Sequence, residues 1–343
     1  MYTEKYELIK SIPNIERLKN KTVLVTGATG LIGSGVVDFL LFLNKKNKMS
    51  INVIATGRNI SSLRKRYKNN ENLFLMELNL DDNITNYNFE QYPNFIIHAA
   101  SAANPNYYQN NPVETMTGNF LGCLNLLNFF SGDKLENFLF ISSGEIYGEF
   151  PSTVTTITEE MSGYIDILSQ RSCYPMSKRS AETLCISYSS QFNQKVTIGR
   201  PSHIFGPNFN EFDNRVSADF FRKALKNENI VMKSLGQQIR SYTYIDDCVT
   251  GILSVLLNGE NKNAYNITNT ENEIRLCDFA KEIAKQGNVS LVFDLKSNYE
   301  VQKTMNYASF SNQKLKDLGW NPLYDIETGI SAVFKKFENK WEW

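Results

Sequence analysis

Short apolar runs alternate with amphipathic stretches along the first 200 residues of the chain. The apolar runs predict strands at 21–26, 51–56, 73–78, 95–98, 138–142 and 196–200. Between them, helical spacing of apolar positions predicts helices at 31–43, 61–67, 112–130 and 173–191. Strands that alternate with helices in this way form parallel sheets covered on both faces. We therefore predict an α/β fold built on a doubly wound parallel sheet.

The pattern changes after residue 207. Predicted helices at 217–226, 246–257, 276–285 and 326–337, and strands at 230–233 and 240–243, are joined by longer loops. This part is expected to form a smaller mixed α/β lobe at the carboxyl edge of the sheet, where ligands bind in open α/β folds. The predicted organisation is a polar arm or short helix outside the core (1–20), a first domain with crossovers to the second part (21–205), and a C-terminal lobe (206–343).

The charge and the cysteine content restrict the class of protein further. Lys plus Arg (36) balance Asp plus Glu (36), so nothing favours electrostatic capture of nucleic acid or of a membrane surface. The N-terminus lacks the apolar core of a secretory signal, and no stretch approaches the ~20 apolar residues of a membrane helix. Five scattered cysteines are typical of a reducing cytoplasm, and two histidines without clustered ligands argue against a metal site. We expect a cytoplasmic protein whose partner is a small molecule.

A glycine-rich turn follows the first predicted strand, in the sequence TGATGLIG (26–33). In dinucleotide-binding turns, Gly27 would permit the tight turn, Gly30 the close approach of a pyrophosphate, and Gly33 the packing of helix on strand. The N–H groups and the dipole of the helix N-terminus then attract the phosphates. A turn without a ligand is the alternative. The flanking strand and helix favour a nicotinamide dinucleotide.

The end of the second strand bears on the choice between NAD and NADP. An acidic residue there would bond the ribose 2′-hydroxyl, whereas an arginine suits a 2′-phosphate. The sequence is TGRN (56–59), with Arg58 and no acid, followed by Ser61 and Arg64. Arg58 therefore favours NADP over NAD. The alternatives are that it stacks on the adenine or is a solvated charge.

Tyr174 and Lys178 are four positions apart near the start of a predicted helix, which places them on one face. A lysine there can lower the pKa of the phenol and hold a nicotinamide ribose, so that Tyr174 acts as an acid/base near neutral pH. The spacing alone arises by chance in many chains. Its place at a helix start, well after the glycine turn, makes this the predicted hydride-transfer pair.

Ser143 and Glu145 follow the strand that precedes this helix, within ISSGEIYG (141–148). Ser143 is expected to hydrogen-bond a sugar hydroxyl and to share its proton with Tyr174. Glu145 has two interpretations. It either caps the following loop or acts as a second acid/base that faces C5 or C6 of a sugar, and we favour the second.

Several motifs occur in the order found in extended short-chain dehydrogenases/reductases. They are TGATGLIG (26–33), IIHAA (96–100), Asn119, SSGEIYG (142–148), YPMSK (174–178), FGP (205–207), RSYTYIDD (240–247) and LGW (318–320). Over residues 21–338 the chain resembles the nucleotide-sugar epimerase/dehydratase family. The resemblance implies a Rossmann domain that binds NAD(P), a lobe for a nucleotide-diphosphate sugar, and a homodimer formed through the helices of Asn119 and Tyr174.

The same resemblance implies roles for single residues. Arg240, helped by Arg215, is expected to contact the diphosphate, and Asn119 to support the active site. His203, where many members have Asn, is either a loop histidine or a substrate contact. The predicted cofactor contacts beyond the glycines, Arg58, Tyr174 and Lys178 are Thr29, Leu31, Ile32, Asn59, Asn79, Leu80, Ala99, Ala100, Ser101, Asn119, Ser142, Pro201 and His203.

The neighbours of Glu145 bear on the reaction that follows hydride removal, which in this family is usually from sugar C4. The 4,6-dehydratases carry an aspartate where this chain has Gly144, which counts against them. Nucleotide-sugar decarboxylases are similar at 171–174, 178–179, 181–182 and 213–216. However, they carry an arginine before the LGW motif, and this chain has Asn306, Tyr307 and Ala308 there.

We therefore expect redox chemistry at sugar C4, with 4-epimerisation or ketone reduction ahead of other reactions. The alternatives are a UDP-glucuronate-type decarboxylase and a 4,6-dehydratase. A non-catalytic NADP-binding sensor is more remote, because it would not need Tyr174, Lys178, Ser143 and Glu145 together.

Overall fold

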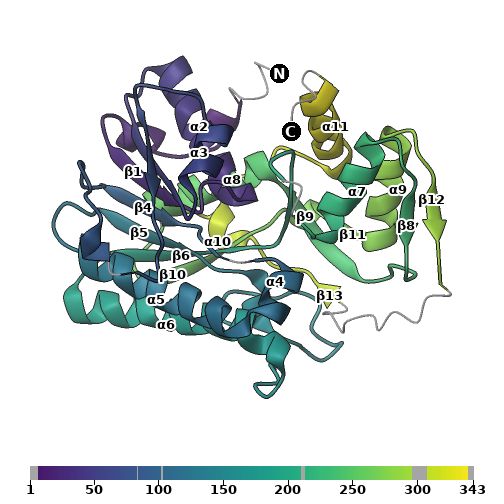
Figure 1. Cartoon of the computed structure of the whole chain (residues 1–343). Helices are drawn as coiled ribbons and strands as arrows, with labels where there is room; N and C mark the ends of the chain where they lie inside the picture. Colours follow the sequence, from purple (N-terminus) through teal and green to yellow (C-terminus); the bar gives the residue numbers. More distant parts are fainter. Residues whose placement is uncertain (1–6, 83, 102, 210–212, 296–306, 339–343) are drawn as a thin grey trace.

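A seven-stranded parallel sheet in the order β10-β6-β5-β4-β1-β2-β3 forms the centre of the molecule (Figure 1). The computed structural model describes residues 7–82, 84–101, 103–209, 213–295 and 307–338. The strands are β1 (Thr22–Thr26), β2 (Asn52–Gly57), β3 (Leu73–Glu77), β4 (Phe95–His98), β5 (Asn137–Ile141), β6 (Val196–Pro201) and β10 (Asn263–Ile267). Each pairs in parallel with its neighbours. The predicted fold class is confirmed.

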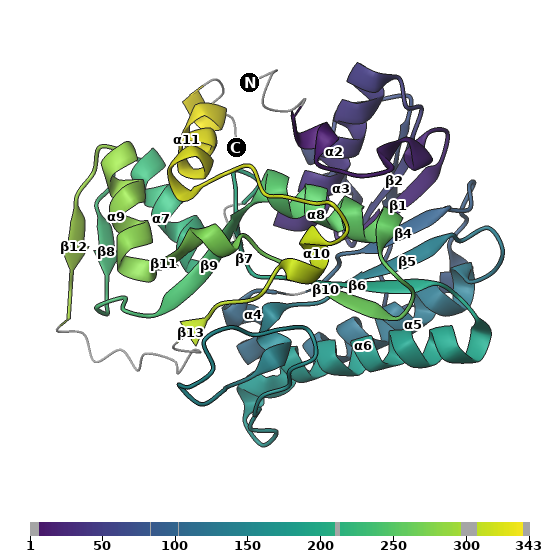
Figure 2. The same cartoon turned by 180° about the vertical axis from the view of Figure 1, so that it is seen from behind.

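Helices cover both faces of this sheet, because successive strand side chains point to opposite sides. In β1, Val23 and Val25 pack in one buried cluster and Leu24 packs in another. The first face is covered by α2 (Leu31–Asn47), α3 (Ile60–Arg66) and α8 (Ile245–Asn258), and the second by α5 (Pro112–Phe130) and α6 (Cys173–Phe192) (Figure 2).

A smaller mixed sheet lies beside the large one (Figures 1 and 2). It contains β7 (His203–Phe205), β9 (Ile239–Tyr244), β11 (Glu273–Arg275) and β13 (Tyr307–Ala308), and a separate pair is formed by β8 (Ile230–Met232) and β12 (Leu291–Phe293). Aromatic rings join this sheet to its helices α7 (Val216–Leu225), α9 (Leu276–Gln286) and α11 (Ile326–Glu338). The ring of Phe279 stacks 3.9 Å from that of Tyr242. Shorter elements are η1 (Ile15–Leu18), η2 (Ile84–Asn86), α4 (Pro105–Asn110), η3 (Gly144–Tyr147), η4 (Gln170–Ser172), η5 (Thr270–Asn272) and α10 (Gln313–Lys316).

The chain returns to the large sheet after contributing to the small one. Strand β10, which pairs with β6, and helix α8, which packs on α2, both come from the range 206–343. The sequence pattern did not predict β10, because Asn263–Ile267 is short and contains two asparagines. The small sheet is therefore assembled from segments that precede and follow this return.

The segment before β1 corrects one expectation. Residues 1–20 were expected outside the core, but Leu8, Ile12 and Leu18 are almost completely buried in it. Leu8 and Ile12 share a face at helical spacing, and residues 7–10 are helical. The described part of this segment therefore belongs to the core.

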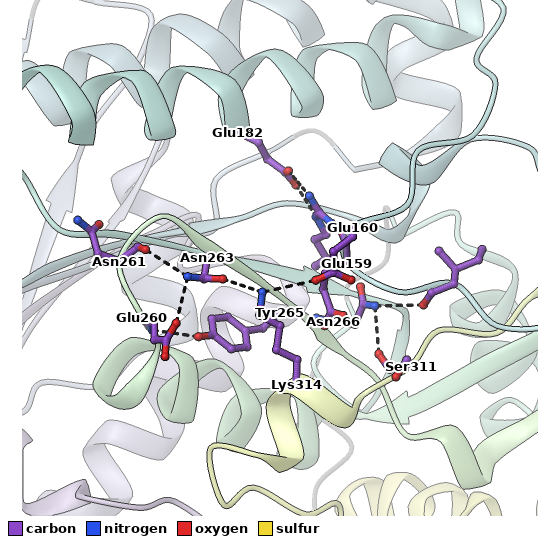
Figure 3. Close-up of polar contacts among 12 residues, drawn as sticks. Glu159, Glu160, Glu182, Glu260, Asn261, Asn263, Tyr265, Asn266, Ser311 and Lys314 are labelled. Carbon is purple, nitrogen blue, oxygen red and sulfur yellow. Dashed lines mark hydrogen bonds and ion pairs between the residues drawn. The ribbon is translucent and has the colours of Figure 1, made fainter.

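A buried polar network joins the strand ends to α6 and to the C-terminal part. Arg200 at the end of β6 binds both carboxylate oxygens of Glu182, at 3.0 and 2.7 Å. It also donates to the Tyr147 hydroxyl at 2.9 Å and to the Glu159 carbonyl at 2.8 Å. The Glu159 carboxylate accepts from the Asn266 backbone N–H at 2.8 Å (Figure 3). These contacts fix the carboxyl ends of β6 and β10, where the candidate site lies.

Candidate active site

The turn between β1 and α2 has the geometry that a dinucleotide requires. Gly27 has a φ of +68°, and a Cβ built on it would lie 2.8 Å from the Ala100 Cα. A Cβ on Gly33 would overlap the Gly27 carbonyl oxygen, so only glycine lets α2 begin this close to β1. Gly30 is the N-cap residue of α2, and no side chain caps this helix start. The backbone therefore leaves a cradle that fits a pyrophosphate.

The predicted contacts near this turn lie where parallel strands end side by side. Thr29, Leu31 and Ile32 belong to the turn and the first turn of α2. Residues 99–101 follow β4, the neighbour of β1, and the Ala100 N–H donates to the Thr26 hydroxyl at 3.0 Å. The structure thus brings these predicted contacts to one edge of the sheet.

The turn after β2 contains an acid that the local sequence pattern did not predict. Arg58 is exposed, and the Asn59 side chain caps α3 by accepting from the Ser62 N–H at 3.0 Å. Glu77, at the end of the adjacent strand β3, accepts from the Ile60 N–H at 3.1 Å. A carboxylate and a guanidinium therefore both stand near this turn. The carboxylate of Glu77 comes to this turn only because β3 pairs with β2, so the residues that follow β2 in the sequence do not reveal it.

The remaining predicted cofactor contacts lie after β3 or at the ends of β5 and β6. Asn79 donates from its side chain to Asp82 at 3.0 Å. Leu80 packs so closely on α5 that a Cβ on Gly122 would be 3.0 Å from it. Ser142 and Pro201 are buried at the ends of β5 and β6. Their roles toward a cofactor stay predictions.

Asn119 connects two parts of the candidate site from the interior of α5. Its side-chain oxygen accepts from the Ser101 hydroxyl at 2.8 Å, and its amide donates to the Ser177 hydroxyl at 2.9 Å. Ser177 in turn donates to the Tyr174 carbonyl at 2.9 Å. This chain of hydrogen bonds holds the segment after β4 against the start of α6, which agrees with the supporting role expected of Asn119.

Tyr174 lies in the first turn of α6 and is 5 % exposed. Burial raises the pKa of its phenol well above the ordinary value, and the charge of Glu145 raises it further. Hydrogen bonds with Ser143 and Ser101 and the charge of Arg215 lower it. The expected lowering of this pKa is thus not present in the structure, because burial outweighs the charges and hydrogen bonds that favour the phenolate.

Lys178 lies one turn further along α6 and is 1 % exposed. Its ammonium donates to the Ile141 carbonyl at 2.8 Å and lies 4.7 Å from the centre of the Phe140 ring. Burial lowers its pKa from 10.5 to about 8. The amine is therefore held at the end of β5, beside the strand that leads to Ser143.

Ser143 and Glu145 are placed by the short helical turn η3. The Ser143 hydroxyl caps η3 by accepting from the Glu145 N–H at 3.1 Å, and it also hydrogen-bonds Tyr174. The Glu145 carboxylate accepts from the Arg171 guanidinium at 3.2 Å. Ser143, Glu145 and Tyr174 therefore meet as predicted. Ser143 caps this loop, and the role of Glu145 as a second acid/base stays a prediction.

Gly144 has no room for a side chain. A Cβ at this position would lie 2.8 Å from the Phe310 ring, which is 3 % exposed and packs on the Tyr147 ring at 5.4 Å. The space that a second carboxylate would need is filled by this ring. The structure thus gives a steric reason for the departure from the dehydratase pattern.

Three predicted substrate contacts approach from the smaller sheet and its flanking loop. Arg215 precedes α7 and is ion-paired with Asp213, and its charge reaches Tyr174. Arg240 in β9 is buried, and this burial lowers the pKa of its guanidinium, although Tyr242 and the charge of Glu145 act in the opposite direction. His203 in β7 contacts solvent, but surrounding atoms desolvate the ring and, with the charges of Arg240 and Arg215, lower its pKa to about 3. Its imidazole is therefore neutral at pH 7.

Two side chains at this site were not predicted as site residues. The Tyr108 ring from α4 stacks on the Tyr174 ring with centres 5.2 Å apart, and the Arg171 guanidinium lies 5.9 Å from the Tyr108 ring centre. Only the RSCY similarity hinted at Arg171, and no local pattern marked Tyr108. Asn306 lies outside the described residues, and Ala308 in β13 pairs with Arg240 in β9.

The described ranges contain neither a cluster of metal ligands nor a membrane-spanning helix. In these ranges, no three His, Cys, Asp or Glu side chains are grouped so that they could hold a metal ion. No helix among the same residues combines the length and the apolar composition needed to cross a bilayer.

Two features define the class of protein: the glycine cradle at the N-terminus of α2, and the pair of Tyr174 and Lys178 on α6, which connects β5 to β6. Together they indicate a nicotinamide-dependent enzyme of the extended short-chain dehydrogenase/reductase fold. Residues 23–268 match the NAD dependent epimerase/dehydratase family, and the chain belongs to this family. The resemblance inferred from the motifs is confirmed.

Similarity to known proteins extends over nearly the whole chain. UDP-glucuronic acid decarboxylase 6 of Arabidopsis thaliana is 30 % identical over 327 residues, which cover 93 % of this chain and 89 % of that protein. UDP-glucuronic acid decarboxylase 1 of Xenopus tropicalis is 28 % identical over 358 residues, with 99 % and 77 % covered. The structure of UDP-glucose 4-epimerase from Thermotoga maritima with UDP-glucose has a TM-score of 0.76 at 23 % identity, with 93 % and 99 % covered. This last likeness shows the shared fold.

Proposed function

We propose that the chain oxidises a UDP-linked uronic acid at C4 and releases its carboxyl group as CO2. The observation that supports this proposal most directly is the packing of the Phe310 ring against Gly144, which leaves no space for an acidic side chain at position 144. A dehydration needs an acid to protonate the leaving hydroxyl, whereas CO2 leaves a β-keto acid without protonation. The names of the two decarboxylase relatives support this proposal. They support the decarboxylase alternative better than the expected 4-epimerase or ketoreductase.

In this proposal, Tyr174 accepts the C4 hydroxyl proton and Ser143 orients that hydroxyl. When bound, the oxidised nicotinamide supplies a hydride acceptor and a positive charge that favours the phenolate. Lys178 holds the nicotinamide ribose. After CO2 leaves, Glu145 delivers a proton taken from water to C5 of the enolate, and Tyr174 returns its proton to the C4 oxygen as the C4 ketone is reduced. The cofactor is regenerated, so no net reductant is consumed.

A 4-epimerase is the second candidate. Tyr307 and Ala308 in β13 stand near the position at which decarboxylases carry an arginine. Epimerisation at C4 needs only Tyr174, Ser143 and space for the ketosugar to turn over.

The test is incubation of the chain with UDP-glucuronate carrying 13C at C6, in the presence of NAD+ or NADP+. We expect labelled CO2 and a UDP-pentose. Tyr174→Phe is expected to lower kcat by at least ~100-fold while dinucleotide binding is retained, because the proton acceptor alone is removed. A hexuronate product that retains the label would contradict the proposal and favour the epimerase.

We propose NADP in preference to NAD on the basis of Arg58, with Glu77 as the nearby group that argues for NAD. The measurement is titration with NADPH and NADH, followed by the change in nicotinamide fluorescence. Arg58→Ala should weaken NADPH binding by roughly 10- to 100-fold and leave NADH binding unchanged, since a charged hydrogen bond is worth about 1.5–3 kcal/mol. Tighter binding of NADH by the unchanged chain would overturn the preference.

The proposal also covers which ligand each part of the chain binds and how two copies of the chain associate. Residues 21–205 would bind the cofactor and residues 206–343 the nucleotide sugar. Homodimers would form through α5 and α6, where Val113 and Met116 of α5 and Phe192 of α6 are exposed. The mass in solution, measured by light scattering, tests the dimer. A cytoplasmic location stays an expectation.

A further inference from the structure

A partly exposed ion pair lies beside the catalytic tyrosine, and its cation, Arg171, has no role in the proposed proton transfers. Arg171, in the turn η4 just before α6, donates to Glu145, and these side chains are 32 % and 37 % exposed. We propose that Arg171 is a specificity-determining residue that binds the C5 carboxylate of the sugar and so selects uronic acids over neutral hexoses. This inference rests on the proposed function in placing the sugar C4 at Tyr174.

The position of Arg171 suits the C5 side of a sugar oxidised at C4. The Tyr108 ring links the two residues, because it stacks 5.2 Å from Tyr174 and lies 5.9 Å from the Arg171 guanidinium. The carboxyl carbon of a uronic acid is two bonds from C4. A sugar with C4 at the Tyr174 phenol therefore has its carboxylate within the neighbourhood of this guanidinium.

The guanidinium retains donors for a second carboxylate. An arginine side chain carries five N–H donors in a planar fork that matches carboxylate oxygens. Arg171 uses Nη1 toward Glu145, and its buried Nε finds no acceptor among the described residues. A buried donor without a partner is unfavourable. A substrate carboxylate that draws the fork into a new position can relieve this cost.

Glu145 and the substrate carboxylate compete for the same cation. Both carry a negative charge, so Glu145 weakens uronate binding as long as it holds Arg171. Removal of the Glu145 charge should strengthen uronate binding, and removal of the Arg171 charge should weaken it. If the ion pair served only to join η3 to η4, loss of either charge would break the same contact. Both substitutions would then change the affinity for the uronate in the same direction.

The experiment measures binding without turnover. Calorimetric titrations use the full chain with Tyr174→Phe, saturated with NAD+ or NADP+, and compare UDP-glucuronate with UDP-glucose. Adding Arg171→Gln should weaken UDP-glucuronate by roughly 10- to 100-fold, the value of one or two charged hydrogen bonds, and leave UDP-glucose within about twofold. Adding Glu145→Gln should tighten UDP-glucuronate and leave UDP-glucose unchanged.

Arg66→Gln is the matched control. Arg66 pairs with Asp38 on the surface of α2 and α3, and the two side chains are 38 % and 37 % exposed. This variant should change neither affinity. Thermal unfolding of each variant confirms that it is folded before binding is compared.

Three results would overturn the inference. They are an equal loss of both sugars in Arg171→Gln, weaker UDP-glucuronate binding in Glu145→Gln, and no preference for UDP-glucuronate before either change. The chain could instead prefer UDP-glucuronate over UDP-glucose in an Arg171-dependent way and yet release no CO2. That result would overturn the proposed decarboxylation but not the role of Arg171. A chain that binds neither sugar overturns both.

Discussion

At the scale of single residues, burial dominates the acid/base properties of the site. Tyr174 and Lys178 are 5 % and 1 % exposed, and burial favours the neutral form of each. The phenol therefore needs nearby positive charge before it can act as a base. Arg215 supplies part of that charge in the structure.

The pKa of Lys178 leads to a pH prediction. In the free enzyme the charged amine is half lost at about pH 8, because burial lowers its pKa to about 8. If the charged form is required, kcat/KM should fall as the pH rises through about 8, since this ratio reports groups of the free enzyme. In Lys178→Arg the guanidinium stays charged, so the alkaline decline should move to higher pH. Profiles of kcat/KM against pH for both proteins provide the check.

A parallel measurement keeps this prediction independent of turnover. Binding of the oxidised dinucleotide to the unchanged chain should weaken across the same pH interval. Dinucleotide affinity that stays constant from pH 7 to pH 9, together with constant kcat/KM, would show that the charge on Lys178 is not required.

At the scale of elements, the turn η3 and the ring of Phe310 determine what position 144 can hold. Gly144→Ala should lower the free energy of unfolding by about 1–3 kcal/mol, because the new methyl group would lie 2.8 Å from the ring. Phe310→Leu in the same chain should recover part of this loss. The measurement is urea unfolding followed by circular dichroism.

Gly118→Ala is the control for this substitution. It lies within α5, and its Cβ would approach no atom closer than 3.6 Å. Alanine should stabilise this helix by about 0.5–1 kcal/mol. If Gly144→Ala were as harmless as Gly118→Ala, the Phe310 ring would not exclude a side chain at position 144.

The elements also show what sequence reasoning can reach. The period of apolar positions predicted β1 to β6 and their helices, because buried parallel strands are short and continuously apolar. Motif order brought Tyr174, Lys178, Ser143 and Glu145 together. The pattern did not reveal the contacts around Glu145 and Gly144. Arg171 meets Glu145 across 26 residues, and Phe310 reaches Gly144 from a distant segment, so both depend on tertiary packing.

At the scale of the whole molecule, the buried pair of Arg200 and Glu182 ties α6 to the large sheet. Both side chains are 11 % exposed. Glu182→Gln should cost about 3–5 kcal/mol of unfolding free energy, because it leaves a buried guanidinium without its counter-charge. Glu7→Gln breaks a pair whose side chains are 66 % and 60 % exposed and should cost less than about 1 kcal/mol. Equal midpoints of urea unfolding for the two variants would contradict this assignment.

The return of the chain to β10 has a consequence for synthesis and for engineering. On the ribosome, β6 stays an open edge until residue 263 has emerged, so the large sheet completes only after β7 and β9 of the smaller one have been made. A fragment that stops at residue 205 would expose the β6 edge and lack α8, which favours aggregation. Exchange of the smaller sheet between relatives should therefore replace the segments on both sides of β10 and retain α8 and β10 themselves.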